Sequence, residues 1–266
     1  LEKPMQLVLD QQLNFDYCLC WANHTWYNKR DNITLQQQQY LGEQDYTAYF
    51  NRLLPHFKSP HYLKIENRPI FSIFNPNEIP DLGVFIESFQ QLAKQAGFDG
   101  IYFIADNTDA TSSYAGKLDG YTRSNYFFKK RNRDNIFSYF KEKLTRKFGL
   151  NQVGPFCYSY PHLVVDQYDD FNDSKYIPSV FTGWDTTPRH LRRGTILKDF
   201  NLQNFKCLLG KVGQTIRRNQ QSSISNQIVI IKSWNEWAEG NLLEPDNIFG
   251  YQLLEVYRGF IISVHK

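Results

Sequence analysis

Two glutamates lie three residues apart, directly after a hydrophobic run near the C-terminal end of the chain. The run Gln227–Ser233 leads into segment 234–240, which reads Trp-Asn-Glu-Trp-Ala-Glu-Gly and carries Glu236 and Glu239. Cleavage of a glycosidic bond needs such a pair, because one carboxyl group protonates the departing oxygen and the other acts as base or nucleophile. Two close carboxylates in a partly apolar pocket also acquire different pKa values, which divides these roles. The alternative is a pair of acids that begins a solvated helix.

Aromatic and amide side chains at two places in the sequence could bind a sugar. Tryptophan rings stack on sugar faces, and amide or imidazole groups form hydrogen bonds with hydroxyls. One group adjoins the glutamates, and the other follows an early strand-like run. For this second group the alternative to sugar binding is structural, with the side chains packed in the rim of the fold. The candidates for substrate binding are Trp234, Asn235 and Trp237 in the first group, and Trp21, Asn23, His24 and Trp26 in the second.

A third group follows another strand-like run and contains Trp184, Asp185 and Arg189. Asp185 could bind a sugar hydroxyl or hold Arg189, but an aspartate beside threonine and proline is also an ordinary turn former. Arg189, with Arg192 and Arg193, could contact a phosphate or could line a solvated helix. The six histidines lack zinc-ligand spacing, so we expect no metal, and no serine occupies the GxSxG motif of a serine nucleophile. We also expect no cofactor.

Six strands and six helices must position these residues. The strand-like runs are near-continuous apolar segments, which is typical of parallel strands covered on both faces. They alternate with segments of helical periodicity, which indicates an α/β domain. The predicted strands are Phe15–Trp21, Pro69–Asn75, Gly100–Ala105, Leu118–Tyr121, Tyr176–Trp184 and Gln227–Trp234, and the predicted helices are Lys3–Gln12, Asp45–His56, Leu82–Gly97, Arg133–Phe148, Asp199–Asn219 and Gly250–His265.

The alternation fits an open doubly wound sheet or a closed barrel. No GxGxxG or GxxxxGK[ST] motif follows a predicted strand, which removes the usual support for a nucleotide-binding open sheet. A (β/α)8 TIM-type barrel needs eight strands and forms its active site at their carboxyl ends. We therefore expect one catalytic barrel domain over residues 1–266, truncated at its N-terminus, with about six of eight strands present. The first and last predicted strands should border the resulting gap.

Composition excludes several classes of protein. The 266 residues are 41% hydrophobic and 21% charged, which excludes disorder as the main state, and a net charge of +3 gives no support for nucleic-acid binding. Aromatic residues make up 16% of the chain, which suits sugar ligands as well as a dense core. The apolar runs are too short to span a membrane, and the four cysteines form no disulfide framework. We expect a reducing, cytoplasmic location.

Together these motifs resemble the WbsX-type family, whose members are often labelled glycosyltransferases of surface-polysaccharide gene clusters. The family is also described as similar to glycoside hydrolase family 99, which includes endo-α-mannosidases. The resemblance spans nearly the whole chain, and segment 234–240 is its most specific part. The chain departs from the family pattern at His24, where an acidic residue is usual, and at Thr186, where asparagine is usual. The matching segments are 1–4, 18–23, 62–65, 69–71, 183–189, 234–240, 243–246 and 250–251.

The resemblance implies a (β/α)8 barrel in which both glutamates are catalytic. Glu236 would deprotonate the 2-hydroxyl of the substrate and Glu239 would be the general acid/base, with retention of configuration through an anhydrosugar. The expected activity is cleavage of α-glycosidic bonds in a polysaccharide or O-antigen-like glycan. Alternatives are a glycosyltransferase of lipopolysaccharide or capsule biosynthesis, and a non-catalytic glycan-binding barrel. Candidate protein partners are polysaccharide-assembly enzymes and other domains of a longer parent chain.

Overall fold

The computed structural model describes residues 2–11, 13–28, 33–106, 115–122, 135–148, 154–166, 174–219 and 227–264. Gln12, residues 133–134 and His265, which the predicted helices include, lie outside these ranges. The chain divides into two compact units, Leu1–Thr122 and Arg123–Lys266, which are treated separately below as the first and second unit.

The first unit contains a parallel sheet whose strands follow one another in chain order. The order is β1 (Leu19–Trp21), β5 (Arg68–Ile73), β6 (Tyr102–Ala105) and β7 (Gly120–Tyr121), and each neighbouring pair is parallel. The short strand β4 (Lys64–Ile65) pairs antiparallel with β5. Four of the predicted strands and their parallel pairing are therefore confirmed.

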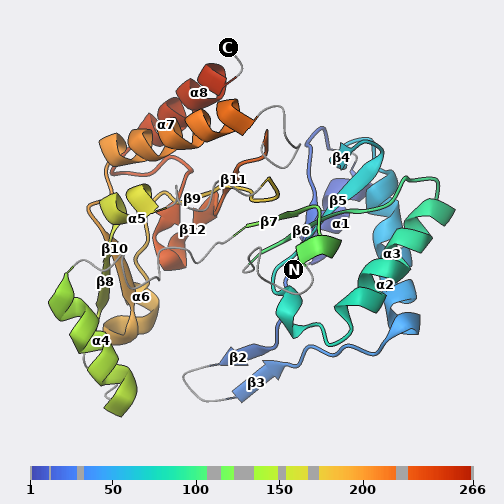
Figure 1. Ribbon diagram of the computed structural model, residues 1–266, viewed down its shortest axis with the longest axis horizontal. Coiled ribbons are helices and arrows are strands. Elements are labelled where there is room, and N and C mark those ends of the chain that lie inside the picture. The colour runs from blue at the N-terminus through green and yellow to red at the C-terminus, as the bar shows by residue number, and fades with distance from the viewer. Residues whose placement is uncertain are drawn as a thin grey trace. The chain divides into compact units, whose positions relative to one another are not determined.

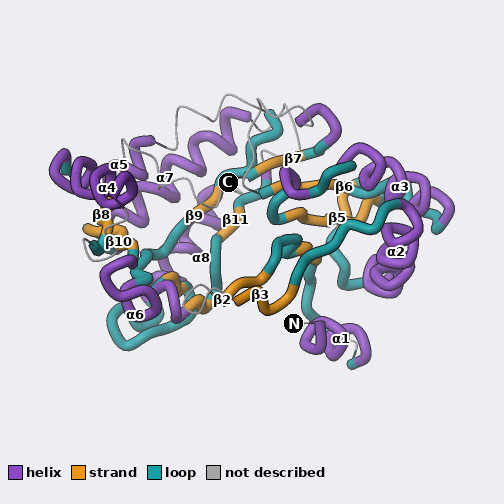
Figure 2. Tube along the Cα trace, turned by 90° about the horizontal axis from the view of Figure 1, so that it is seen from below, coloured by secondary structure: helices purple, strands orange, loops and turns teal. Residues whose placement is uncertain are grey.

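Two helices pack on this sheet, and an aromatic core lies between them and the strands. α2 (Glu43–Lys58) and α3 (Leu82–Gln95) lie side by side along the sheet, whereas α1 (Glu2–Asp10) precedes β1 (Figure 1, Figure 2). Phe71 and Phe103 from the sheet meet Phe85 and Phe89 from α3, and all four side chains are fully buried. The Phe85 and Phe89 ring centroids are 4.3 Å apart. Part of the high aromatic content therefore forms this core.

A projecting hairpin of the first unit was not predicted from the sequence. Strands β2 (Trp26–Asn28) and β3 (Ile33–Gln36) pair antiparallel, and every residue of β3 is exposed. A short 3-10 helix, η1 (Pro76–Glu78), follows β5, and another, η2 (Ala115–Lys117), precedes β7.

In its described residues, the second unit contains two further parallel strand pairs and one hairpin. β8 (Phe156–Ser159) pairs with β10 (Thr195–Lys198), and β9 (Ser179–Val180) pairs with β11 (Ile230–Ile231). The hairpin joins β12 (Asn235–Glu236) to β13 (Asn241–Leu242). The helices are α4 (Ile136–Phe148), α5 (Tyr160–Asp166), α6 (Thr187–His190), α7 (Leu202–Asn219) and α8 (Gln252–Val264), with the 3-10 helices η5 (Leu191–Arg193) and η7 (Trp237–Glu239).

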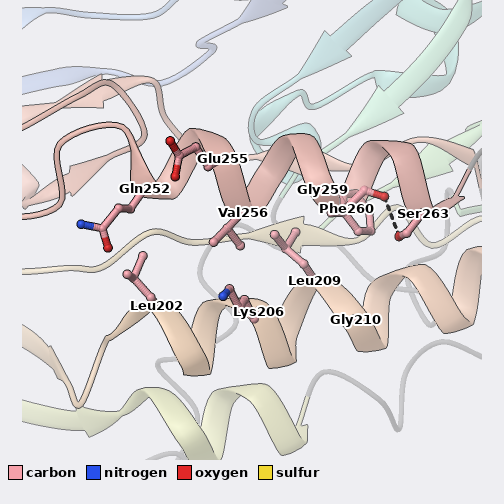
Figure 3. Close-up of a pocket in the computed structure, with 10 residues that line it drawn as sticks. All are labelled: Leu202, Lys206, Leu209, Gly210, Gln252, Glu255, Val256, Gly259, Phe260 and Ser263. Carbon is pink, nitrogen blue, oxygen red and sulfur yellow. Dashed lines mark hydrogen bonds between the residues drawn. The ribbon is translucent and has the colours of Figure 1, made fainter.

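Helices α7 and α8 pack against each other and leave a groove of about 450 Å³ between them (Figure 3). Leu209 of α7 and Val256 of α8 form its apolar floor, and Lys206 and Glu255 line it as well. No predicted site residue lines this groove. The candidate site must therefore be sought at the strand ends.

The structure establishes a mixed α/β fold in the described residues. Among these residues, β1 and β11 each pair with a single strand. Three expectations stay predictions: that the sheet closes into a barrel, that two strands are missing at the N-terminus, and that residues 1–266 form a single domain. No helix among the described residues is long and apolar enough to cross a membrane.

Loss of a buried ring should destabilise the first unit. Phe89→Ala removes a fully buried side chain that contacts rings on α2, β5 and β6. We expect the free energy of unfolding to fall by about 3–5 kcal/mol, as measured by urea denaturation followed by far-UV circular dichroism. Leu41→Ala, at a side chain that is 68% exposed, is the control and should change it little. Equal effects of the two substitutions would contradict this description of the core.

Candidate functional site

Two neighbouring parallel strands bring the predicted carboxylates and the Asp185 loop together. Ile230 of β11 is opposite Ser179 of β9, so both strands end at the same edge (Figure 1). The loop after β9 carries Trp184 and Asp185, and the segment after β11 carries both glutamates. This part of the predicted arrangement at the strand ends is present within the second unit.

Both glutamates lie on one tight hairpin. Glu236 is the last residue of β12 and pairs with Asn241 of β13, while Glu239 ends the intervening 3-10 turn η7. The backbone N–H of Glu236 donates to Ser233 Oγ at 2.9 Å. Gly240 then adopts a left-handed conformation, with φ of +57°, that returns the chain to β13. The acidic pair therefore lies on a hairpin and does not begin a solvated α-helix.

Backbone contacts join this hairpin to the Asp185 loop. The Asp185 N–H donates to the Glu239 carbonyl at 2.7 Å, and the buried Asn241 Nδ2 donates to the Gly183 carbonyl at 2.8 Å. A Cβ atom on Gly183 would lie 3.1 Å from the Gly240 carbonyl oxygen, and one on Gly240 would lie 3.1 Å from the Asp185 nitrogen. A Cβ atom at either position would be in tighter than ordinary van der Waals contact, and both residues have a positive φ that favours glycine.

Glu239 lies in a less hydrated environment than Glu236. Its side chain is 25% exposed, whereas Glu236 is exposed to solvent. Burial raises the pKa of Glu239, and the negative charge of Glu236 raises it further, although the positive charges of Lys232 and Arg189 oppose both effects. The Arg189 guanidinium lies 4.0 Å from the Glu239 carboxylate. A carboxyl group with a raised pKa retains its proton more readily, which suits a general acid.

Asp185 initiates a turn in this structure. Its carboxylate accepts hydrogen bonds from the backbone N–H of Thr187 at 2.8 Å and from the Thr187 hydroxyl at 2.6 Å, at the start of α6. Asp185 therefore forms the turn that its neighbouring threonine and proline also allowed. Arg189, for which Asp185 was one predicted partner, has its guanidinium beside Glu239 instead.

The tryptophans near the carboxylates differ in accessibility. Trp234 is 53% exposed and Trp237 is 60% exposed, so both can receive a sugar face. Trp184 is buried, and the Lys232 ammonium lies 4.7 Å from the centre of one of its rings. Asn235 is exposed, and its Nδ2 lies 3.5 Å from a carboxylate oxygen of Glu244.

Asn23 in the first unit connects two strand ends. It is fully buried, its Nδ2 donates to the Asn75 carbonyl at 2.7 Å, and its Oδ1 accepts from the Asn75 N–H at 2.8 Å. Tyr40 completes the arrangement, because its hydroxyl donates to the Asn23 carbonyl at 2.9 Å. Asn23 therefore has a structural role after β1, and its contact with a sugar hydroxyl stays a prediction.

The other three candidates of the first unit have different surroundings. Trp21 packs against Tyr49 and Phe85, with ring centroids 5.2 and 5.3 Å apart. His24 is partly buried, and its Nδ1 has no hydrogen-bond partner among the described residues. Trp26 is 43% exposed on the β2–β3 hairpin. The two units are not placed relative to each other, so the meeting of these residues with the glutamates stays a prediction.

Sequence reasoning missed Lys232, Asn241 and the two contact glycines as parts of the site. Lys232 follows the apolar strand by one residue, and its N–H donates to the Val180 carbonyl at 2.9 Å. Asn241 directly follows the Glu-Gly pair. The position of Asn241 beside the acidic motif was the available signal. Its hydrogen bond to Gly183, 58 residues away, leaves no local pattern in the sequence. No group of three potential metal-binding side chains is present among the described residues.

Similar folds occur among solved glycosidase structures. Two structures of the GH99 endo-alpha-mannosidase from Bacteroides thetaiotaomicron match 98% of this chain and 72–74% of theirs, at 13–14% identity, with TM-scores of 0.51 and 0.52. A structure described as a glycoside hydrolase-like protein matches 88% of this chain and 64% of its own, at 14% identity and a TM-score of 0.53. These similarities establish that the chain has a mixed α/β fold like that of these structures.

The model of the family described as Glycosyltransferase WbsX matches residues 1–257, so the chain belongs to this family. Two curated relatives, each described as uncharacterized protein WxcX, come from strains of Xanthomonas campestris pv. campestris and are 24% identical over 284 aligned residues. The alignments cover 97% of this chain but only 36% of those proteins, so the chain spans about a third of the length of these relatives.

Substitution of a contact glycine should disturb the second unit. Gly183→Ala combines a φ of +119° with the close approach to Gly240. We expect the free energy of unfolding, measured by urea denaturation, to fall by about 1–3 kcal/mol. Gly210→Ala is the matched control, because a Cβ there has no neighbour within 4 Å in helix α7. That control should gain about 0.5–1 kcal/mol, and a loss of similar size at both glycines would contradict the packing argument.

The raised pKa of Glu239 should make stability depend on pH. Folding favours the protonated carboxyl group, so stability is lost as the pH rises from the ordinary glutamate value of 4.5 through the folded-state pKa. Glu239→Gln removes this loss, and the variant should become more stable relative to the wild type between acidic and neutral pH. Urea denaturation across this range measures the difference. Glu255→Gln, at an exposed carboxylate of α8, is the control, and an identical pH profile for both variants would contradict the assignment.

Proposed function

We propose that the chain forms the catalytic part of a carbohydrate-active enzyme of glycoside hydrolase family 99 type, which cleaves α-glycosidic bonds in a polysaccharide or O-antigen-like glycan. The observation that carries this proposal is the unequal environment of two glutamates on one hairpin at a strand end. Glu239 is partly buried with a raised pKa, whereas Glu236 is open to solvent. Membership of a carbohydrate-active family and the glycosidase-type fold support the same conclusion.

The two carboxyl groups would act in sequence on one sugar. Glu239 donates its proton to the departing glycosidic oxygen, while Glu236 accepts the proton of the 2-hydroxyl group on the same sugar. The freed oxygen attacks the anomeric carbon and forms an anhydrosugar. Water then gives a proton to the now ionised Glu239 and attacks the anomeric carbon, while Glu236 returns its proton to the 2-oxygen. The ring opens with overall retention, and both carboxyl groups regain their starting protonation states. Roles of this kind are expected from the resemblance to endo-α-mannosidases, and the buried position of Glu239 suits a proton donor.

The surrounding side chains would hold the glycan. Trp234 and Trp237 are exposed on either side of Glu236 in the sequence and offer apolar surfaces to sugar rings. Asn235 and Arg189 offer polar groups beside them. The remaining proposed contacts are Trp184 and Asp185 from the β9 loop and Trp21, Asn23, His24 and Trp26 from the first unit.

A glycosyltransferase is the second candidate, and the description of the family itself favours it. Such an enzyme builds a glycan from an activated donor and must hold the donor phosphates. The sequence contains no DxD motif, so the exposed Arg189, Arg192 and Arg193 are the candidates for this contact. Incubation with glycan alone tests for hydrolysis through released reducing sugar. Incubation with a nucleotide-sugar tests for transfer through released nucleotide.

The catalytic roles predict different responses to two substitutions. Glu239→Gln should retain glycan binding and reduce turnover of the natural glycan by about 10²–10⁴-fold, because the positioned proton donor is lost. Glu236→Gln should reduce turnover as well. With a substrate whose leaving group is already acidic, the Glu239 variant should recover part of its rate, whereas the Glu236 variant should not. Steady-state rates of both variants on both substrates measure this.

Glu255→Gln is the matched control, because Glu255 is an exposed carboxylate on α8, outside the hairpin and the acidic pair. Its turnover should remain close to that of the wild type. Near-normal turnover of the natural glycan by either of the two catalytic variants would show that the substituted carboxylate is not catalytic. Full binding with no turnover by the wild type on any glycan would favour the non-catalytic alternative.

A further inference from the structure

Helix α4 of the second unit presents an apolar stripe to solvent. Phe137 is 81% exposed, Phe140 53%, Leu144 52% and Phe148 62%. Their spacing of three, four and four residues places them on one face of the helix. A soluble helix ordinarily turns such a face toward the core, so four large exposed apolar side chains in one row mark an interaction surface.

The opposite face of α4 fixes this orientation. Glu142 is only 3% exposed and accepts a hydrogen bond from the hydroxyl of Tyr158 in β8 at 3.5 Å. Ser138 and Thr145, which lie on the same side of the helix, are partly buried. α4 packs against β8, as Figure 1 shows. The polar side of the helix thus faces the protein, and the apolar side faces away from it.

Positive charge borders the stripe. Lys141 and Lys147 lie on its two sides by helical geometry, Lys143 lies further round, and all three are exposed. The Lys147 ammonium lies 5.6 Å from the centre of the Phe148 ring. The single carboxylate of α4 is the buried Glu142, so the described outward face carries cationic and apolar groups without acidic ones.

We propose that α4 lies in the interface of an anionic lipid membrane, with its aromatic stripe among the acyl chains and its lysines on the headgroups. An amphipathic helix with phenylalanine and leucine on one face and lysine along its borders has the composition of an interfacial helix. Negative headgroups complement the lysines on both sides of the stripe. A second copy of α4 is a poorer occupant, because it would place lysines against lysines. Association of this kind would bring the candidate site to membrane-linked substrates.

Vesicle co-sedimentation tests this proposal on the full chain. The protein should pellet with vesicles of phosphatidylcholine and phosphatidylglycerol, should pellet far less with phosphatidylcholine alone, and should be released by salt. Phe140→Ser and Leu144→Ser should each weaken binding by about tenfold or more, because each removes apolar surface that the membrane would bury. Lys141→Gln and Lys147→Gln should each weaken binding by about fivefold.

Ile262→Ser is the matched control, because Ile262 is 48% exposed on α8, away from the stripe, and this variant should bind as the wild type does. Circular dichroism of every variant checks that folding is retained. Absence of pelleting by the folded wild type would overturn the proposal, as would equal binding by the α4 variants. Self-association that Phe140→Ser abolishes, without vesicle binding, would instead assign the stripe to a second copy and would also overturn it.

Discussion

The candidate site depends on the close approach of two backbone segments at the ends of β9 and β11. Parallel pairing of these strands starts both segments at the same edge, and Gly183 and Gly240 then approach so closely that a Cβ atom on Gly183 would lie 3.1 Å from the Gly240 carbonyl oxygen. The Asp185 N–H and the Asn241 side chain close the gap with hydrogen bonds. Because Glu239 provides one of the bonded carbonyls, the backbone of the predicted proton donor is held at two strand ends rather than on a free loop.

In the first unit, too, an asparagine side chain connects the segments after two neighbouring strands, here β1 and β5. The side-chain amide of Asn23 pairs with the backbone of Asn75. Its Nδ2 donates to the Asn75 carbonyl, and its Oδ1 accepts from the Asn75 N–H. A buried asparagine is costly without partners, so bonds at both ends of the Asn23 amide make the connection specific. In both units an asparagine side chain joins the segments that follow two neighbouring parallel strands. Residue types that suit sugar binding in a sequence can therefore serve the scaffold that positions the site.

Elements with long periodic or strongly apolar patterns could be predicted from the sequence. The structure therefore contains a helix in each of the six predicted helices and a strand in each of the six predicted strands. Sequence reasoning missed the strands β4, β8 and β10, the β2–β3 and β12–β13 hairpins and the helices α5 and α6, because short elements carry little periodicity. It also identified Glu236 and Glu239 as neighbours, since one hairpin contains both. It could not identify Asn241 or Lys232, whose roles arise from contacts with a loop more than 45 residues away.

The difference between the two glutamates follows from the hairpin that carries them. A 3-10 turn separates them by three residues, so Glu236 ends an exposed strand while Glu239 meets the Asp185 loop. Contact with that loop removes water from Glu239, and the nearby Lys232 and Arg189 keep the resulting rise in pKa from being larger. The hairpin, the loop and the two cations therefore together set the environment of Glu239, in which burial and the charge of Glu236 raise its pKa and the cations oppose that rise.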